Sequence, residues 1–230
     1  MPPVYQRRER LKSMGIETWV PRISVPHGPE ARAGEGETEN ICAHPLILDW
    51  DDLEQEVLGC TRCALHETRT QAVFGVGNRT AQWLFIGEAP GEQEDLQGEP
   101  FVGRAGQLLN EMIKAIGLSR EEVYIANVLK CRPPKNRDPL PQEAAACESH
   151  LLSQLALIKP SIIVAVGRIA AQNLLKTGTP IGKLRGVVHD YQSIPLVVTY
   201  HPAYLLRSQT EKRRAWEDLK LARRTLNGRH

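Results

Sequence analysis

The chain has 230 residues, 41% of them hydrophobic, and a formal net charge of +2 at neutral pH. This length fits one domain or one domain with an appendage, and 18 Gly and 16 Pro residues are too few for a low-complexity chain. No apolar run approaches the roughly 18 residues that would span a bilayer, and residues 1–20 contain no signal-peptide stretch. We therefore expect a soluble, cytoplasmic protein.

The first 50 residues predict an extension rather than part of the folded domain. Their apolar residues lack a sustained period, and residues 26–40 are rich in Gly, Pro and Glu without a bulky apolar side chain. Such a composition is typical of a flexible linker. We therefore expect the folded domain over residues 51–230, and a free thiol at Cys42 in the extension.

The spacing of the other four cysteines indicates metal or redox chemistry. Cys60 and Cys63 form a C-x-x-C pair, and Cys131 and Cys147 follow with 67 and then 15 residues between. A structural zinc site usually uses two such short pairs, whereas an iron–sulfur cluster accepts four thiolates from scattered loops. Spacing alone favours a cluster over zinc, with a metal-free set as the third alternative.

Short apolar or β-branched runs predict four buried strands, over Trp83–Gly87, Val123–Leu129, Ser161–Gly167 and Ile194–Tyr200. Helical periods lie between and after them. The predicted helices are one that ends at Gly117, one over Pro141–Ile158, and a last one with Ser208 and Glu211 at capping-box spacing and Ala215, Trp216, Leu219 and Ala222 on one side. This alternation predicts a mostly parallel sheet with both faces covered, and a ligand crevice beyond the carboxyl ends of the strands.

The loop after the first strand is rich in glycine over residues 87–106, which lets the backbone approach a ligand closely. It is neither a Walker A sequence nor a dinucleotide fingerprint. Phe101 lies between Pro100 and Val102 in this loop. A large ring there is either a plug in the core or a stacking platform.

The second strand carries Asn127, which is either a hydrogen-bonded component of the core or a residue that recognises a ligand. Four positive charges follow within eight residues, a density suited to phosphates. They are Lys130, Arg132, Lys135 and Arg137.

The fourth strand leads to His201, which is either a capping residue of a turn or an acid or electrophile at the crevice. The apolar Tyr204, Leu205 and Leu206 stand beside Arg207, as a wedge inserted into a base stack would require. The alternative is that they pack under the final helix. Residues 207–230 carry eight Lys or Arg against three Asp or Glu, so a polyanion such as nucleic acid is a plausible partner.

Taken together, the sequences GEAPGEQED, GEPFVGRAGQLL, NVLKCRPPKNRDP and TYHPAYLLR, with the upstream cysteine pair, resemble family 4 uracil-DNA glycosylases, the iron–sulfur type of bacteria and archaea. The resemblance runs from about Asp52 to Arg224 and leaves the extension uncovered. It implies a three-layer α/β/α sandwich around a mostly parallel four-stranded sheet. It also implies a repair enzyme that hydrolyses the N-glycosidic bond of uracil in DNA. We expect this enzyme to be a monomer with nucleoid-associated activity and to act on single- or double-stranded DNA. The implied cofactor is a 4Fe-4S cluster on Cys60, Cys63, Cys131 and Cys147.

The resemblance gives the pocket residues roles that agree with their chemistry, because a base in a duplex must be flipped out before it can be cleaved. Phe101 would stack on uracil and Asn127 would recognise its O4 and N3 edge. His201, as a neutral imidazole, would donate a hydrogen bond to the O2 atom of the leaving uracil. The implied contacts to DNA are Lys130, Arg132, Lys135, Arg137, Tyr204, Leu206 and Arg207.

One position departs from the better-known family 1 enzymes, in which an aspartate stands where this chain has Ala89. The group that positions water is therefore open between Glu88, Glu94 and the DNA phosphates, and we favour Glu88. Ala89 is expected to line the pocket, and Glu94 to crowd the site of a thymine methyl group.

Two alternative functions belong to other classes. A relative that traps uracil-DNA covalently would need a reactive histidine in a basic insertion after Gly106, but here Leu108 and Leu109 continue directly into a helix. A binding module or redox carrier would explain the cysteines and leave Phe101, Asn127 and His201 without a role.

Overall fold

A computed structural model describes residues 49–228 of the chain. The predicted extension over residues 1–50, except its last two residues, and the predicted free thiol at Cys42 lie outside the described residues. Helix α2 (Trp50–Leu58) opens the described part, capped by Asp49, whose side chain accepts hydrogen bonds from the N–H groups of Asp51 and Asp52. No helix in this part is both long and apolar enough to cross a membrane.

A six-stranded mixed sheet forms the centre of the fold, with the order β1-β3-β2-β4-β6-β5. Its strands are β1 (Val76–Gly77), β2 (Trp83–Gly87), β3 (Tyr124–Asn127), β4 (Ile162–Val166), β5 (Val188–Tyr191) and β6 (Ile194–Thr199). The four strands expected from the sequence are β2, β3, β4 and β6, and they pair in parallel. The predicted strand number is wrong, because β1 and β5 add antiparallel edges.

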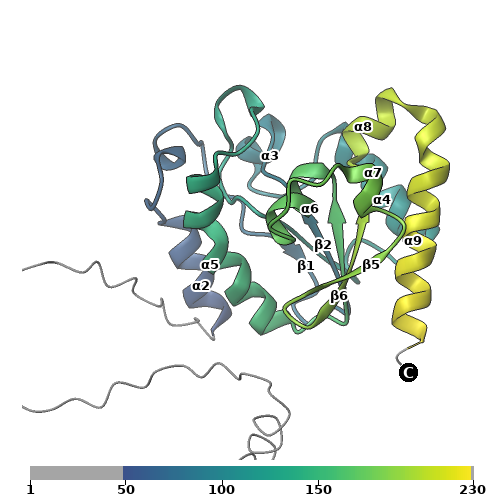
Figure 1. Ribbon diagram of the computed structural model, residues 1–230. Helices are drawn as coiled ribbons and strands as arrows, with labels where there is room; N and C mark the ends of the chain where they lie inside the picture. The colour runs from purple at the N-terminus through teal and green to yellow at the C-terminus, as the bar shows by residue number, and fades with distance from the viewer. Residues whose placement is uncertain (1–48, 229–230) are drawn as a thin grey trace, which may run out of the picture. The chain divides into compact units, whose positions relative to one another are not determined.

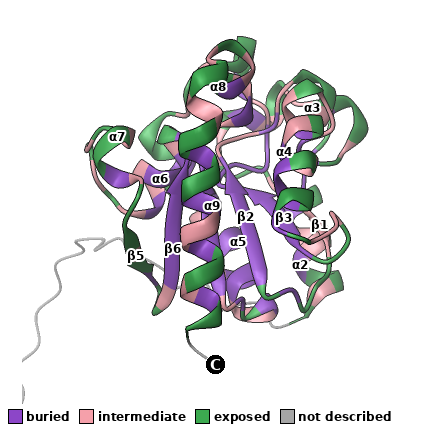
Figure 2. Cartoon of the chain, turned by 90° about the vertical axis from the view of Figure 1, so that its right-hand side faces the viewer, coloured by how far each residue is buried: buried purple, intermediate pink, exposed green. Residues whose placement is uncertain are grey.

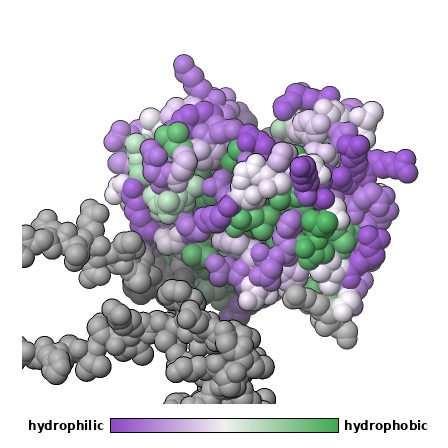
Figure 3. All heavy atoms as spheres, in the orientation of Figure 1, coloured by the Kyte–Doolittle hydropathy of each residue, from purple (hydrophilic) through white to green (hydrophobic). Residues whose placement is uncertain are grey.

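Both missed strands lack the apolar run that marks a buried strand. β1 has only two residues, and β5 is exposed along most of its length. Val187 and Val188, where the chain enters β5, are 49% and 44% exposed. Figure 3 shows a face of the molecule on which apolar areas are interrupted by polar residues.

Helices cover both faces of the sheet, so the expected α/β class is confirmed (Figure 1). One face carries α2, α5 (Pro141–Ile158) and α6 (Arg168–Leu174), and the other carries α4 (Arg104–Ala115), α8 (Pro202–Arg207) and α9 (Lys212–Asn227). The strands supply both cores by alternation: Leu84 and Ile86 of β2 belong to one, and Trp83 and Phe85 to the other. Figure 2 shows the central strands buried between these layers.

The last helix differs from its prediction at two points. Ser208 makes no side-chain capping bond, because residues Gln209–Glu211 form the 3-10 turn η3, and α9 begins only at Lys212. Trp216 was expected to pack with its neighbours but is 37% exposed. The shorter elements are η1 (Ala64–Glu67), α3 (Glu92–Gln97), η2 (Pro134–Asn136) and α7 (Ile181–Leu184).

Candidate functional site

A cavity of about 490 Å³ opens beyond the carboxyl ends of the parallel strands, where the fold predicts a ligand crevice. Its walls come from the loops after β2, β3 and β6 and from α8. Eight residues singled out in the sequence line it: Glu88, Ala89, Glu94, Phe101, Asn127, Arg137, His201 and Arg207. The topology therefore brings together residues that are more than 100 positions apart in the chain, such as Glu88 and His201.

Phe101 and Asn127 meet at Gly87, the last residue of β2. A Cβ atom at Gly87 would lie 2.6 Å from Cζ of Phe101 and still closer to Oδ1 of Asn127, so a larger residue would not fit without displacing them. The ring centroids of Phe101 and His201 are 5.6 Å apart, with 31° between the ring planes. Phe101 is only 7% exposed, yet its ring lines the cavity, so it is packed and accessible to a ligand at once.

Asn127 carries an unsatisfied polar atom. Its side chain is 2% exposed, and its Oδ1 has no hydrogen-bond partner among the described residues. Leaving a buried acceptor unpaired costs about 1–3 kcal/mol, so such groups are uncommon unless a ligand completes them. This favours ligand recognition over a role as internal hydrogen-bonding residue. The parallel register places Asn127 opposite Gly87.

His201 is the N-cap of α8, and its Nδ1 accepts a hydrogen bond from the Ala203 N–H at 3.1 Å. Burial lowers the pKa of His201 to about 4, with the charge of Arg207 acting in the same direction. The ring is therefore neutral near pH 7. Since Nδ1 accepts a hydrogen bond, the proton resides on Nε2, which leaves Nε2–H as a donor. The capping role and the electrophilic role expected from the sequence are thus compatible.

Glu88 lies in a partly desolvated environment at the end of β2. The pKa of Glu88 is raised to about 7, mainly by burial and also by the negative charge of Asp138, while the positive charge of Arg168 acts in the opposite direction. Asp138 also lines the cavity, and its Oδ2 is 2.8 Å from Nη2 of Arg168. Sequence reasoning missed Asp138 because the basic residues before it dominated the interpretation of that segment.

Glu94 supports the loop that holds Phe101. Its Oε1 accepts hydrogen bonds from the backbone N–H groups of Val102 at 3.0 Å and Gly103 at 3.1 Å. The carboxylate therefore stabilises the start of α4 as well as lining the cavity. Its predicted contact with a thymine methyl group stays a prediction.

The predicted DNA contact of Lys130 is wrong. Lys130 is 1% exposed, and its Nζ donates to the side chain of Gln154 at 2.6 Å and to backbone carbonyls of Asn127 at 3.0 Å and Phe74 at 3.3 Å. A buried ammonium group with three acceptors cannot reach a phosphate. The sequence shows the charge of a residue after a strand but not the direction in which it points.

The remaining cations of this segment differ in their neighbours. Arg137 forms two hydrogen bonds with Glu143, at 2.6 and 2.9 Å, and Arg132 bonds Asn136 at 2.8 Å. Lys135 is exposed at the tip of the segment. These three residues stay predicted DNA contacts.

The predicted wedge divides into packed and exposed residues. Leu205 is 1% exposed and belongs to the core under α9. Tyr204 is 38% exposed, and its ring centroid lies 5.1 Å from that of Tyr200. Leu206 is half-buried and Arg207 is exposed at the cavity rim. Of the three apolar side chains, Tyr204 and Leu206 reach the surface and Leu205 does not.

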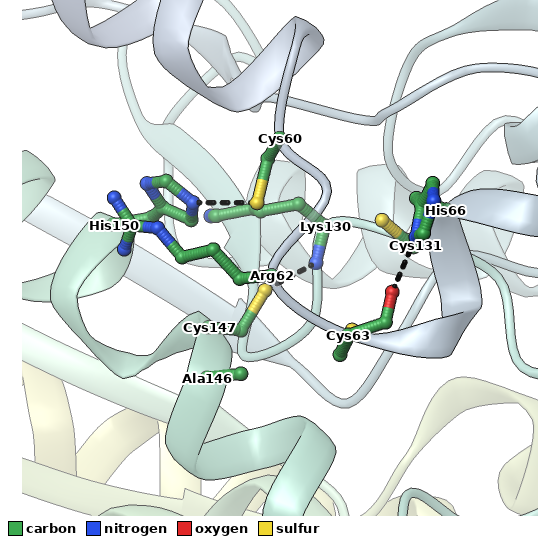
Figure 4. Close-up of a pocket in the computed structure, with 9 residues that line it drawn as sticks. All are labelled: Cys60, Arg62, Cys63, His66, Lys130, Cys131, Ala146, Cys147 and His150. Carbon is green, nitrogen blue, oxygen red and sulfur yellow. Dashed lines mark hydrogen bonds between the residues drawn. The ribbon is translucent and has the colours of Figure 1, made fainter.

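A second, smaller pocket is lined by Cys60, Cys63, Cys131 and Cys147 (Figure 4). The four cysteines come from the chain after α2, the loop after β3 and helix α5, and none forms a disulfide. The free space between the lining side chains is about 10 Å³. No three His, Cys, Asp or Glu side chains between residues 49 and 228 are grouped closely enough to hold one metal ion.

Three of the four sulfurs of this cysteine site have a nitrogen atom within hydrogen-bonding distance. Nη1 of Arg69 donates to Sγ of Cys131 at 2.9 Å, and the backbone N–H of Lys130 donates to Sγ of Cys147 at 3.4 Å. Nε2 of His150 lies 3.3 Å from Sγ of Cys60. Burial raises the pKa of Cys147 to about 11 and also raises that of Cys131. Burial therefore disfavours the thiolate form of these two cysteines, which a bound metal would stabilise, and N–H donors of this kind also stabilise metal-bound sulfur.

Comparisons with known proteins agree with this geometry. The sequence model of the uracil DNA glycosylase superfamily matches residues 74–220. A type-4 uracil-DNA glycosylase of Archaeoglobus fulgidus is 50% identical over 164 residues, which cover 68% of this chain and 82% of that protein. One of Thermotoga maritima is 45% identical over 175 residues, covering 74% and 91%. A type-5 uracil-DNA glycosylase of Thermus thermophilus is 33% identical over 147 residues, covering 57% and 65%.

Proposed function

Because the chain belongs to the type-4 uracil-DNA glycosylase family, we propose that it repairs DNA by hydrolysing the N-glycosidic bond of uracil, which leaves an abasic site. The observation that carries the proposal is the unpaired, buried Oδ1 of Asn127 in a cavity it shares with Phe101 and His201. A flipped base would supply the partner that Asn127 lacks and would lie against Phe101 and His201. A binding module or redox carrier would need none of these three side chains.

Recognition of uracil follows from the hydrogen-bonding edge of the base. The Oδ1 of Asn127 would accept the N3–H of uracil, and its Nδ2 would donate to O4. Cytosine presents an acceptor at N3 and a donor at N4, so both contacts would become repulsive. Stacking on Phe101 would offset part of the loss of stacking in DNA.

Cleavage transfers negative charge to the departing uracil. His201 would donate a hydrogen bond from Nε2 to O2. Its low pKa keeps the ring neutral, so Nδ1 can accept the hydrogen bond from the Ala203 N–H while Nε2–H donates. Ionised Glu88 would stabilise the positive charge on the sugar and orient the attacking water. As the water oxygen bonds to the sugar carbon, the electron pair of the broken bond leaves with uracil and the water proton passes to Glu88. Asp138 would add to the negative potential at this wall of the cavity.

The cysteine site suits a 4Fe-4S cluster held by Cys60, Cys63, Cys131 and Cys147. Each thiolate of such a cluster binds a different iron, whereas the sulfurs around one zinc ion stand only about 3.8 Å apart at Zn–S bonds of about 2.3 Å. The origin of the four cysteines in three separate segments of the chain, with only one C-x-x-C pair, favours the cluster over zinc. Because the free space is about 10 Å³, binding would have to spread these side chains. When bound, the cluster would cross-link three segments of the chain.

Contact with DNA would involve the exposed groups around the cavity, and the substrate would be uracil-containing DNA in single- or double-stranded form. Arg132, Lys135, Arg137 and Arg207 would bind phosphates, while Tyr204 and Leu206 would fill the gap left by the flipped base. We expect the protein to act as a monomer on the nucleoid in the cytoplasm.

An excision assay tests the proposal. The purified protein is incubated with oligonucleotides that contain uracil, hypoxanthine or a thymine mismatch, and alkali then cleaves the abasic sites. We expect strand scission of the uracil substrate with more than one turnover per enzyme and no shifted protein band on a denaturing gel. A product level equal to that of the no-enzyme control would reject the proposed function, and a stable protein–DNA band would support a covalent trap instead.

A further inference from the structure

Phe101 has an unusual backbone conformation for a bulky residue. Its φ is 56°, in the left-handed region that large side chains rarely adopt. Gly106 permits this turn, because a Cβ atom there would overlap the carbonyl oxygen of Phe101. Such a conformation persists only where surrounding contacts hold it. The contacts around the loop therefore determine where the ring lies in the cavity.

Arg120 supplies contacts on the carbonyl side of this loop. Its Nη2 donates to the carbonyl oxygen of Pro100 at 2.6 Å, and its Nη1 lies 3.5 Å from that of Phe101. The same Nη1 donates to Oδ1 of Asn110 on α4 at 3.1 Å. The guanidinium group is half-buried, and Arg120 does not line the cavity. The guanidinium group of Arg120 is therefore held by Asn110 on α4 while its two terminal nitrogens reach the consecutive carbonyl groups of Pro100 and Phe101.

The two sides of the loop are held by different charged side chains. Glu94 accepts the N–H groups of Val102 and Gly103, whereas Arg120 donates to the carbonyls of Pro100 and Phe101. A planar guanidinium with several donors can satisfy two carbonyls and an amide at once, and a lysine ammonium cannot reproduce that fork. Since Glu94 lines the cavity and Arg120 does not, only Arg120 can be changed without altering the cavity wall itself.

We propose that Arg120 is a positioning residue that sets the ring of Phe101 against the flipped base and so contributes to the binding of that base. The inference rests on the proposed function. Stacking of a base on an aromatic side chain contributes a factor of roughly 5 to 150 in affinity, and this contribution falls when the ring is displaced. Arg120 acts on that stacking only through the backbone of Phe101.

The test compares Arg120→Met and Arg120→Lys with the wild type in excision of a uracil oligonucleotide and in inhibition by free uracil. For Arg120→Met we expect kcat/KM to fall about tenfold, mainly through KM, and free uracil to inhibit about tenfold less well. Arg120→Lys should restore part of both. Arg79→Met is the matched control, since Arg79 pairs with Asp51 and Glu54 away from the loop.

A double-mutant cycle with Phe101→Leu separates positioning from general stability. In the Phe101→Leu background, Arg120→Met should cost almost nothing further, because the ring it positions is absent. An equal loss in both backgrounds, or wild-type kcat/KM and uracil inhibition in Arg120→Met, would overturn the proposal. If Arg120→Met does not fold, the same cycle with Arg120→Lys applies, with an expected loss of about threefold. Wild-type excision in the same assay distinguishes failure of this inference from failure of the proposed function.

Discussion

The two ends of a single short segment, residues 127–131, line the cavity and the cysteine site, yet the two sites are built in opposite ways. The cavity has a volume of about 490 Å³. Among the described residues, the buried Oδ1 of Asn127 has no hydrogen-bond partner, and the neutral ring of His201 has Nε2–H as a donor for a ligand. The cysteine site is narrow, and three of its sulfurs already have nitrogen neighbours. An unpaired buried polar group indicates a site that a substrate completes, whereas sulfurs that already have nitrogen neighbours in the fold indicate a site that stabilises it. Substitutions in the first should reduce catalysis at constant stability, and substitutions in the second should reduce stability first.

The largest catalytic effect is expected at His201. His201→Ala removes the donor to uracil O2 and should lower kcat by a factor of about 10² to 10³, as loss of an oxyanion donor does. His201→Ser retains an oxygen that can cap α8 but not the donor at Nε2. Single-turnover rates and thermal melting of both variants check this. Activity of His201→Ser near that of the wild type would show that the histidine is only a cap.

Asn127→Ala should reduce kcat/KM by about 30-fold or more, equivalent to about 2 kcal/mol of transition-state stabilisation. Its melting temperature should stay unchanged or rise, because the substitution removes a buried acceptor that lacks a partner. Excision kinetics and calorimetry provide the two readouts. A marked loss of stability with full activity per folded molecule would reverse the assignment of Asn127.

Cys147→Ala should reduce stability before it reduces catalysis, in contrast to substitutions in the cavity. The variant should hold less iron, show weaker absorbance near 400 nm and melt at a lower temperature, while excision declines only in proportion to the folded fraction. Iron analysis and melting curves of wild type and variant measure this. Zinc in a colourless wild-type protein would contradict the cluster, and an unchanged melting temperature would contradict the structural role.

Glu88 should impose a pH dependence on the cavity. Because its pKa is raised to about 7 and the ionised form is the active one, kcat/KM should fall about tenfold per pH unit below pH 7 and level off above it. A raised carboxyl pKa also means that folding stability from this group declines as pH rises from about 4.5 to 7. Glu88→Gln should therefore remove the inflection in the rate and melt higher than the wild type at pH 8. A flat wild-type profile across pH 7 would exclude Glu88 as the ionising group.

The smallest effect is expected at Lys135. Lys135→Met should weaken DNA binding a few-fold and reduce the salt dependence of binding by about one unit of slope, as removal of one phosphate contact does. Lys130→Met should lower the melting temperature and leave that slope unchanged, because Lys130 is buried. Titrations of DNA binding at several salt concentrations compare the two variants. A reduced salt dependence in Lys130→Met and an unchanged one in Lys135→Met would show that Lys130, and not Lys135, contacts DNA.

Sequence patterns predicted the parts of this molecule that depend on local apolar periodicity. Strand β2 has the bounds expected for Trp83–Gly87, and helix α5 those expected for Pro141–Ile158. The edge strand β5 was missed because an edge strand need not be apolar. The strand ends were the right places to look, since Glu88, Asn127 and His201 all line one cavity.

Features that depend on the direction of a side chain were not predictable in this way. Lys130 turns inward to three acceptors, although its charge and its basic neighbours favoured a surface role. Arg120 contacts a loop 19 residues earlier in the chain, and no spacing rule connects the two. Asp138 influences Glu88 across 50 positions of sequence. Each of these contacts arises from tertiary packing.

Lys130 links the two sites through one residue. Its backbone N–H donates to the sulfur of Cys147, while its ammonium group holds the carbonyl of Asn127. The same lysine therefore joins the cysteine site to the backbone of the residue whose side-chain amide is proposed to distinguish uracil from cytosine. Loss of the cysteine site would therefore loosen this segment together with the rest of the fold, so excision and thermal stability should decline in step.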